Sequence, residues 1–330
     1  MSPPAPQRNH VHHRVKLRKC ENGTGRTRNM GKTAVYALGG NALSPPGEPS
    51  SSHAEALARA MSDVVDLLEQ GWSVVLTHGN GPQVGALLAM DAADVHSMDE
   101  WVAASQGMIG YQLALHLDSI FERRRRPERT AVVLTRVVVD ESDEAFAWPT
   151  KPVGPVLDSK TVMSADWDIA QTVNGPRRVV ASPKPITIHD LDVIQHLVNL
   201  HAVVICGGGG GVPVSGQGGE LHGLPAVIDK DLFSSLLAVQ LQADALIIST
   251  GVDAVYTDFG TPHAQRLSTL SLEEADRLTV EGAFPAGSMK PKVAALCQFI
   301  KRREAGCAVL CRPGEALAAL RGGAGTVVVR

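Results

Sequence analysis

The sequence predicts an α/β fold in which a largely parallel sheet is covered by helices on both faces. Apolar, strand-like runs alternate with segments of helical spacing through most of the chain, which is typical of parallel sheets. Aromatic residues make up only 4% of the chain whereas glycines number 32, a balance that favours many tight loops. Several apolar runs end in a glycine turn directly before a helix, where parallel sheets place their ligand sites.

Length and composition limit the class of protein. The chain has 330 residues, of which 44% are hydrophobic and 20% charged, enough for one large or two medium domains. No apolar run approaches the ~20 residues that span a bilayer, and no secretory leader pattern opens the sequence. The five cysteines lack the spacing of a disulfide framework, so we expect reduced thiols, a cytoplasmic location and no membrane partner.

Residues 1–32 form a basic segment of their own. They hold eight of the 31 Lys and Arg residues but one of the 34 Asp and Glu residues, which leaves an acidic body. Such a segment fits either an unstructured extension or a nucleic-acid-binding arm. It has no periodicity and no interleaved aromatic residues, so the extension is the favoured interpretation. Met30 comes just before the first predicted strand, and we expect the functional domain to begin near it.

The first half of the body, residues 33–201, is predicted to form an N-terminal lobe. Apolar residues recur on one face of the segment 53–70, as expected for a helix packed on a sheet. We predict strands over 33–38, 73–77, 130–139 and 179–181, and helices over 53–70, from about 84, over 100–126 and over 190–200.

Composition changes over residues 140–178. Acidic residues cluster at its start, prolines recur and helical periodicity disappears. We therefore predict a small subdomain that projects from the sheet edge. A long excursion of this kind inside a compact domain is usually functional or mobile. Lys151 lies within it, in the stiff frame Pro149-Thr150-Lys151-Pro152.

Residues 202–330 are predicted to form a C-terminal lobe. A buried strand over 202–206 runs into five consecutive glycines, Gly207–Gly211, where a ligand can approach a backbone that carries no Cβ atoms. We predict further strands over 245–250, 308–310 and 326–329, and helices over 231–242, 271–281 and 288–305.

Glycine turns follow four predicted strands, at 39–42, 79–82, 207–211 and 251. One such turn is weak evidence, but four in one chain favour a shared anion site. Phosphoryl transfer needs little covalent help from a protein; it needs positioning and neutralisation of negative charge by amides, lysines and metal. Asn41 and Asn80 lie in two of the turns.

Three lysines are the candidate cations. Lys151 has its proline frame, Lys230 lies between Asp229 and Asp231 at a predicted helix start, and Lys292 follows a Gly-Ser-Met-Lys-Pro turn. An isolated lysine is usually a solvated surface charge. The flanking residues make these three lysines better candidates for a functional site. Asp231 could orient lysines, hold magnesium through water, or simply cap the helix.

Further candidates flank the last glycine turn. Thr250, Asp253 and Tyr256 are expected at the mouth of the strand 245–250, where Tyr256 and Met289 could pack on an adenine ring or belong to the core. His78 is interpreted as a turn or core histidine, since the sequence places no carboxylate to orient it.

At this point the motifs together resemble those of the carbamate kinases, members of the amino acid kinase family. The resemblance runs in order from about Thr33 to the C-terminus and includes the projecting subdomain. The segments that carry it are Ala37–Ala42, Thr77–Gly85, Pro149–Pro155, Ser182–Pro185, Cys206–Pro213, Val227–Asp231 and Gly287–Lys292.

The resemblance implies an open αβα sandwich with a central sheet of about eight strands, and a homodimer. It implies reversible phosphoryl transfer between ATP and carbamate, giving ADP and carbamoyl phosphate, with Mg²⁺ held mainly by nucleotide phosphates and water. In related enzymes the reaction often runs towards ATP, at the end of arginine catabolism.

The resemblance also implies roles for individual residues. Lys151 would reach the substrate from the subdomain, Lys230 and Lys292 would neutralise the transferred phosphoryl group, and Asp231 would organise the lysines. Substrate binding would fall to Gly39, Gly40, Asn41, Gly79, Asn80 and Gly81, and nucleotide binding to Gly208, Gly209, Thr250, Asp253, Tyr256 and Met289.

The chain departs from the family pattern in the subdomain. The segment between Pro155 and Arg177 is short, and Asn174-Gly175-Pro176 replaces the usual approach to Arg177-Arg178. A kinase of another small carboxylate on the same fold therefore stays open, and substrate preference would distinguish it. A nucleotide- or nucleic-acid-binding regulator is the non-catalytic alternative; it would bind through residues 1–29 in a strongly salt-dependent way.

Overall fold

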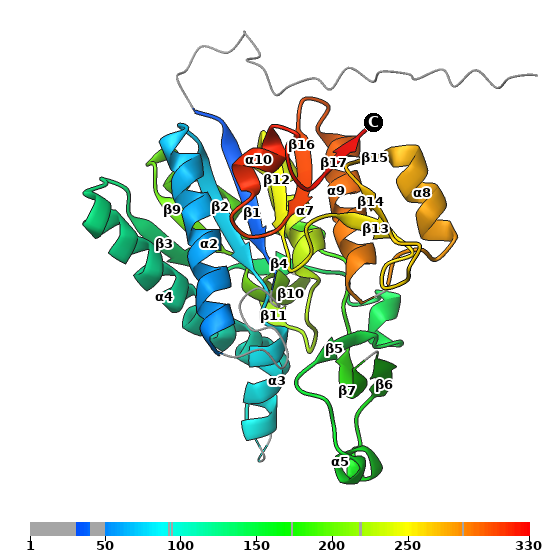
Figure 1. Cartoon of the computed structure of the whole chain (residues 1–330). Helices are drawn as coiled ribbons and strands as arrows, with labels where there is room; N and C mark the ends of the chain where they lie inside the picture. Colours follow the sequence, from blue (N-terminus) through cyan, green and yellow to red (C-terminus); the bar gives the residue numbers. More distant parts are fainter. Residues whose placement is uncertain are drawn as a thin grey trace, which may run out of the picture.

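The computed structural model describes residues 31–39, 50–91, 93, 95–172, 174–217, 220–285 and 287–330. Its centre is an eight-stranded sheet in which six neighbouring strands run parallel (Figure 1). β17 is antiparallel to β16, and β15 is parallel to β17. The order across the sheet is β15 (Thr269–Ser271), β17 (Thr326–Val329), β16 (Cys307–Cys311), β12 (Ala245–Ser249), β1 (Thr33–Leu38), β2 (Ser73–His78), β9 (Val203–Cys206) and β3 (Thr130–Val133).

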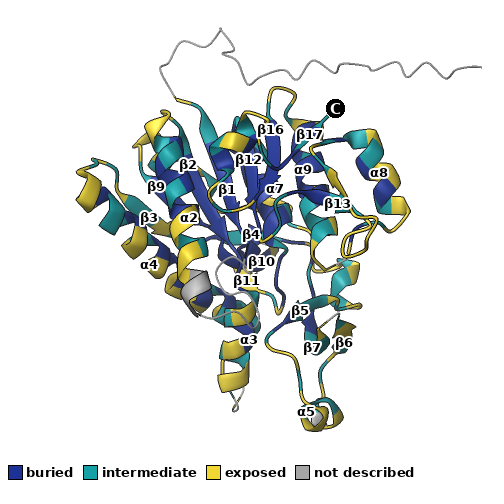
Figure 2. Cartoon of the chain, in the orientation of Figure 1, coloured by how far each residue is buried: buried dark blue, intermediate teal, exposed yellow. Residues whose placement is uncertain are grey.

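Two apolar layers hold helices against the two faces of this sheet. Successive residues of a strand point to opposite faces, so Val35 and Ala37 of β1 belong to one layer and Tyr36 belongs to the other. The inner strands, β16, β12, β1, β2 and β9, are buried along nearly their whole length, as Figure 2 shows. The first layer holds α6 (Leu191–Asn199), α7 (Lys230–Gln240), α8 (Leu272–Val280) and α9 (Met289–Arg302), and the second holds α2 (Ser50–Glu69), α4 (Met98–Arg124) and α10 (Ala316–Leu320).

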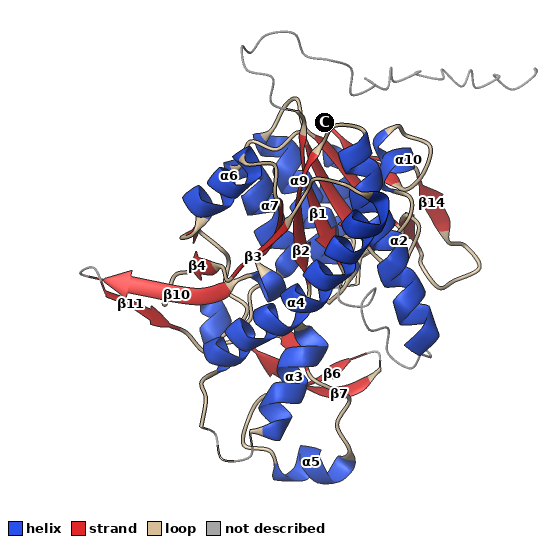
Figure 3. Cartoon of the chain, turned by 90° about the vertical axis from the view of Figure 1, so that its left-hand side faces the viewer, coloured by secondary structure: helices blue, strands red, loops and turns tan. Residues whose placement is uncertain are grey.

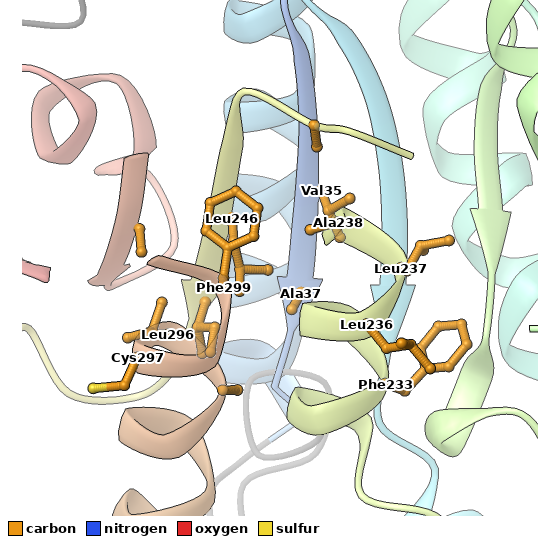
Figure 4. Packing of buried hydrophobic residues seen from close by; sticks show 14 of the residues in the cluster. Val35, Ala37, Phe233, Leu236, Leu237, Ala238, Leu246, Leu296, Cys297 and Phe299 are labelled. Carbon is orange, nitrogen blue, oxygen red and sulfur yellow. The ribbon is translucent and has the colours of Figure 1, made fainter. Parts of the chain in front are cut away.

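Helices α7 and α9 pack side by side on β1 and β12. Figure 4 shows Phe299 of α9 next to Leu246 of β12, and Phe233 and Leu237 of α7 on the other side of β1, which carries Val35. All five side chains are fully buried. Burying a large apolar side chain contributes about 1.5–3 kcal/mol, so this layer holds the two helix N-termini firmly in place. These N-termini carry Lys230 and Lys292.

The predicted fold class is confirmed: the chain forms an α/β fold on a largely parallel central sheet. The predicted division into lobes falls just before β9, which pairs with β2 and β3 inside the continuous sheet. That division stays a prediction. Most predicted helix and strand boundaries agree with the structure within three residues. No helix among the described residues is long and apolar enough to cross a membrane.

The single strand predicted over 130–139 is wrong. The structure divides it into β3 in the central sheet and β4 (Arg136–Val138) in a second sheet. Thr135 lies at the break, where its backbone N–H and C=O are both bonded to the side chain of Gln106. A continuous apolar run therefore leaves one sheet and enters another. The second sheet has the order β11 (Glu220–Gly223), β10 (Val212–Gln217), β4 and β8 (Thr187–Ile188).

The projecting subdomain is more regular than its composition suggests. Figure 1 shows it hanging below the sheet beside α3 (Gly81–Met90), which begins three residues earlier than predicted. The strand predicted at 179–181 is the end of a longer subdomain strand. The subdomain sheet has the order β5 (Lys151–Val153), β7 (Gly175–Val180) and β6 (Ile169–Thr172), and the adjoining helices are η1 (Glu144–Phe146) and α5 (Ser159–Ser164).

Two hairpins complete the fold. The pair β10–β11 extends away from the body beyond the edge of the sheet, as Figure 3 shows. The pair β13 (Val255–Thr257) and β14 (Gln265–Leu267) follows the end of β12. Neither hairpin stands out in the sequence, because β11, β13 and β14 are short and mostly exposed or half-buried, and only the first four residues of β10 are buried.

The five-glycine stretch is buried and tightly packed against the chain itself. It contains the short helix η2 (Gly208–Gly210), and Gly207, Gly209, Gly210 and Gly211 all have positive φ angles. A Cβ on Gly207 would lie 1.8 Å from the ring of Phe233. Internal packing thus explains why the glycines are required, whereas the sequence had suggested only the approach of a ligand.

We expect Gly207→Ala to lower the free energy of unfolding by about 2–4 kcal/mol, because it combines a left-handed backbone with a clash in the core. Chemical denaturation followed by circular dichroism measures the change. Gly251→Ala is the matched control: this glycine also follows a central strand, but a Cβ there would meet nothing within 4 Å. Equal stability of the two variants would contradict the packing account.

Candidate active site

The candidate site lies at the carboxyl ends of the central parallel strands. β1, β2 and β12 end beside one another, since Gly39 N–H donates to Ser249 and Gly79 N–H donates to Leu38. The helices α3, α7 and α9 begin at this edge. Helix N-termini present unpaired N–H groups and favour negative charge, so the edge suits an anionic ligand.

The centre of the site is the buried carboxylate of Asp231. Lys230 Nζ donates to its Oδ1 at 2.6 Å, and Lys292 Nζ donates to its Oδ2 at 3.0 Å. The Asp231 side chain is only 3% exposed, and the two lysine side chains are 10% and 15% exposed. One carboxylate thus holds two ammonium groups in fixed positions, and this trio carries a net positive charge.

Asp229 forms a second ion pair beside the first. Its Oδ2 accepts from Lys151 Nζ at 2.9 Å, and its Oδ1 accepts from the N–H groups of Asp231 and Leu232. Asp229 is therefore the N-cap of α7, and the alternative that Asp231 caps this helix is wrong. The cap fixes the Asp229 carboxylate. Its ion pair with Lys151 therefore holds this subdomain lysine at the N-terminus of α7, where Lys230 also lies.

The electrostatics favour the charged forms of Asp231 and Lys292. Burial alone would raise the pKa of Asp231, but Lys230 and Lys292 outweigh it and hold that pKa well below its usual range. Burial opposes charge on Lys292, but Asp231 outweighs burial and raises its pKa. Burial lowers the pKa of Lys230, although Asp231 counteracts the effect. At neutral pH the carboxylate is ionised, as a buried pair requires.

Hydrogen bonds below the lysines hold the helix start to the sheet. Ser234 Oγ donates to the carbonyl of Lys230 at 2.6 Å and lies 2.7 Å from Thr77 Oγ1 on β2. Thr77 and Ser234 are fully buried. These contacts join α7 to the end of the strand that leads into the Gly79–Gly81 turn.

His78 is a buried turn histidine, as interpreted from the sequence. Its Nδ1 donates to the carbonyl of Gly79 at 3.0 Å, and burial lowers its pKa to about 4. The imidazole is therefore neutral at neutral pH, and its low pKa makes it a weak proton acceptor in this buried position. A Cβ on Gly208 would lie 2.4 Å from the His78 ring, so the histidine fills the space under the glycine stretch.

The predicted substrate-binding residues divide into two groups. Gly79, Asn80 and Gly81 lie together between β2 and α3, and Gly39 lies beside Thr250 at the adjoining strand ends. Asn80 Nδ2 donates to Ser105 Oγ at 2.9 Å, so its side chain supports the turn and leaves the start of α3 without a side-chain cap. Gly40 and Asn41 lie outside the described residues.

The predicted nucleotide-binding residues surround the ends of β12 and α9. Asp253 accepts from the hydroxyl of Tyr256 at 3.0 Å, and Thr250 N–H donates to Cys311. Met289 is the first residue of α9 and packs on the apolar layer. Gly208 and Gly209 are buried, and a Cβ on Gly209 would lie 2.0 Å from the Asn80 amide. Their roles towards a nucleotide stay predictions.

Sequence reasoning missed several charged residues of this region. Asp229 was seen only as a neighbour of Lys230, whereas the structure makes it the partner of Lys151. Arg266 and Arg312 both form ion pairs with Asp253, at 3.2 and 3.5 Å. Burial and the Tyr256 and Arg266 hydrogen bonds act in opposite directions on Asp253, and the bonds prevail, lowering its pKa. No sequence spacing predicts the arginines, because they come from a hairpin and a loop.

Comparisons with known proteins identify the family. The sequence profile described as the amino acid kinase family matches residues 32–311. Carbamate kinase 1 of Enterococcus faecium is 42% identical over 282 residues, which cover 82% of this chain and 90% of that protein.

Solved structures extend the likeness to the fold. Carbamate kinase from Giardia lamblia bound to citric acid superposes with a TM-score of 0.83 at 35% identity, covering 91% of this chain and 98% of the other. The same enzyme bound to AMP-PNP gives a TM-score of 0.79 at 34% identity, with coverages of 91% and 98%. The chain therefore belongs to the amino acid kinase family and, within it, to the carbamate kinases.

Proposed function

We propose that this protein transfers a phosphoryl group reversibly between ATP and carbamate, forming ADP and carbamoyl phosphate. The observation that carries the proposal is the pair of lysines held by one buried carboxylate at the starts of α7 and α9. The identity to carbamate kinases supports the choice of substrates. By the same likeness we propose a cytoplasmic role in arginine breakdown, running towards ATP.

The lysines suit a direct, in-line transfer. The moving phosphoryl group spreads negative charge over its outer oxygens, and preorganised cations stabilise this charge without first having to reorganise. Lys230 and Lys292 are held apart by Asp231 and face the same edge as the helix N-termini. Lys151 would contact the carbamoyl end from the subdomain. Because the transfer is direct, no covalent enzyme intermediate is needed.

The nucleotide would lie over the C-terminal strands. Thr250, Asp253 and Tyr256 follow the end of β12, and Met289 begins α9, three positions before Lys292. The complex of the Giardia lamblia carbamate kinase with AMP-PNP supports nucleotide binding in this fold. The Gly79–Gly81 turn and the uncapped start of α3 would then hold the acyl phosphate.

The charged groups fit a Mg²⁺ ion that is held by the nucleotide and water. Both oxygens of Asp231 are bonded to lysines, and the oxygens of Asp229 are bonded to Lys151 and to backbone N–H groups. The described residues contain no cluster of three metal-ligating side chains. Mg²⁺ commonly binds through phosphates and several waters, and when bound it would neutralise phosphate charge.

We also propose a homodimer formed through α4 and β3. Met108, Tyr111 and Leu115 on α4 are each more than half exposed, and Val132 on β3 is 43% exposed. The two elements touch, because a Cβ on Gly110 would lie 2.5 Å from Val132. β3 is the last strand of the central sheet, so this apolar face lies at its open edge. A second copy of the chain would cover it.

The first test is ATP formation from ADP and carbamoyl phosphate in a coupled assay. We expect wild-type protein to be active and Lys230→Ala to lower kcat by about 10²–10³-fold, the usual cost of removing one preorganised charge at a transition state. Lys301→Ala is the control, because this lysine forms an exposed ion pair on the far end of α9. An inactive wild type, faster turnover of another carboxylate, or full activity of Lys230→Ala would refute the assignment.

The second test concerns the dimer. Tyr111→Glu places a charge in the proposed interface, and we expect a monomer at micromolar concentration, measured by analytical ultracentrifugation. Val280→Glu is the matched control, since Val280 is 89% exposed on α8 at the opposite side of the molecule. A wild-type monomer, or an unchanged dimer in Tyr111→Glu, would show that this face serves another purpose.

A further inference from the structure

The position of Lys151 depends on how the subdomain is attached to the body. Lys151 begins the short strand β5, and its Nζ must reach Asp229 on α7. We propose that Gly85, Gly154 and Arg177 are positioning residues, which set β5 against α3 and thereby deliver Lys151 to the site. The inference rests on the proposed function and adds a second set of residues to it.

The first observation is a backbone-to-backbone contact between α3 and the subdomain. Gly85 is buried in α3, and a Cβ there would lie 1.8 Å from Gly154 Cα and 2.0 Å from Gly154 N. These neighbours are main-chain atoms, so no side-chain rotation could make room. Gly154 itself has a φ angle of +70°, which favours glycine. Any larger residue at position 85 must push the strand away from the helix.

The second observation is that the N–H and the carbonyl of Gly154 both form hydrogen bonds, each with a different part of the chain. Its N–H donates to the carbonyl of Gly81 at the start of α3, at 3.3 Å. Its carbonyl accepts from Nη2 of Arg177, which lies on β7. The residue after β5 is thus joined to the body through Gly81 and to the subdomain sheet through Arg177.

Arg177 has an unusual charge environment. It is half-buried, forms no ion pair within the part of the chain that the structure describes, and its buried Nε has no hydrogen-bond partner there. Burying a guanidinium without a counter-charge is costly, so a purely structural role would be served better by a neutral side chain. The hydrogen bond from its guanidinium group to the carbonyl of Gly154 accounts for the orientation of the Arg177 side chain.

The contact transmits directly to Lys151. Val153 is buried in an apolar cluster with Val84 of α3 and Val180 of β7, and Lys151 pairs with Val180 across the subdomain sheet. Only two residues lie between Lys151 and Gly154, so β5 moves as one short, paired segment. Asp229 cannot follow, because it caps α7. A displacement at Gly85 must therefore open the Lys151–Asp229 pair.

The experiment is a double-mutant cycle of Gly85→Ala and Lys151→Ala, with the coupled assay as its readout. A misplacement of about 1 Å at a reacting group can cost up to 10²-fold in rate, so we expect Gly85→Ala to lower kcat by about 10–100-fold. The KM for ADP should stay within about twofold. In the Lys151→Ala background, Gly85→Ala should have almost no further effect.

Gly323→Ala is the matched control, because that glycine is exposed near the C-terminus and a Cβ there makes only an ordinary contact at 3.5 Å. Arg177→Gln should show the same dependence on Lys151, and Arg177→Lys should restore part of the rate. If Gly85→Ala does not fold, Arg177→Gln carries the test alone. If Lys151→Ala has no measurable turnover, crystal structures of the single variants replace the cycle, and Lys151 should then lie beyond 4 Å from Asp229.

Equal losses in the wild-type and Lys151→Ala backgrounds would overturn the inference, because the glycine contact would then act on general stability. A raised KM for ADP in Gly85→Ala, or an intact Lys151–Asp229 pair in its crystal structure, would overturn it as well. An inactive wild type would refute the proposed function instead, so the two failures are distinguishable.

Discussion

The whole site depends on one buried carboxylate. Asp231 is shielded from water and could not remain charged there without the two ammonium groups that it accepts from. Removing either lysine would leave one oxygen of the buried carboxylate without its partner, and removing the carboxylate would leave two like charges close together. The arrangement therefore fixes the distance between Lys230 and Lys292 and keeps both ready for a phosphate group.

The rest of the fold holds this trio in place. The apolar layer shown in Figure 4 anchors α7 and α9, whose first turns carry all three residues. Asp229 caps α7 and also receives Lys151, which links the subdomain to the same helix start. The glycine stretch packs against His78, Asn80 and Phe233, and so brings β9 close to the end of β2. Contacts within the chain therefore account for the glycines of this stretch.

Much of this could be predicted from the sequence because the signals are local. Apolar alternation along a strand and glycines before helices define the central sheet, and the lysines stand out through their flanking prolines and carboxylates. The pairing of Lys151 with Asp229 could not be predicted, since 78 residues separate them and only the tertiary fold brings them together. The same holds for Arg312 and Asp253.

One wrong prediction and one alternative that the sequence left open have a common physical cause. The run 130–139 has the composition of one strand, but the Gln106 side chain takes the backbone bonds of Thr135 and divides it between two sheets. The first turn of α7 contains two aspartates, and propensity alone does not tell which one caps the helix. The structure assigns the cap to Asp229 and so frees Asp231 to hold the lysines. In both cases a single side-chain contact decided between local alternatives.

The most direct measurement is a crystal structure with Mg²⁺, ADP and a planar fluoride mimic of the transferred phosphoryl group. The account predicts that Nζ of Lys230 and Nζ of Lys292 both contact the mimic while Asp231 still bridges them. A mimic bound away from these lysines, or an Asp231 carboxylate that releases both and coordinates the metal, would contradict it.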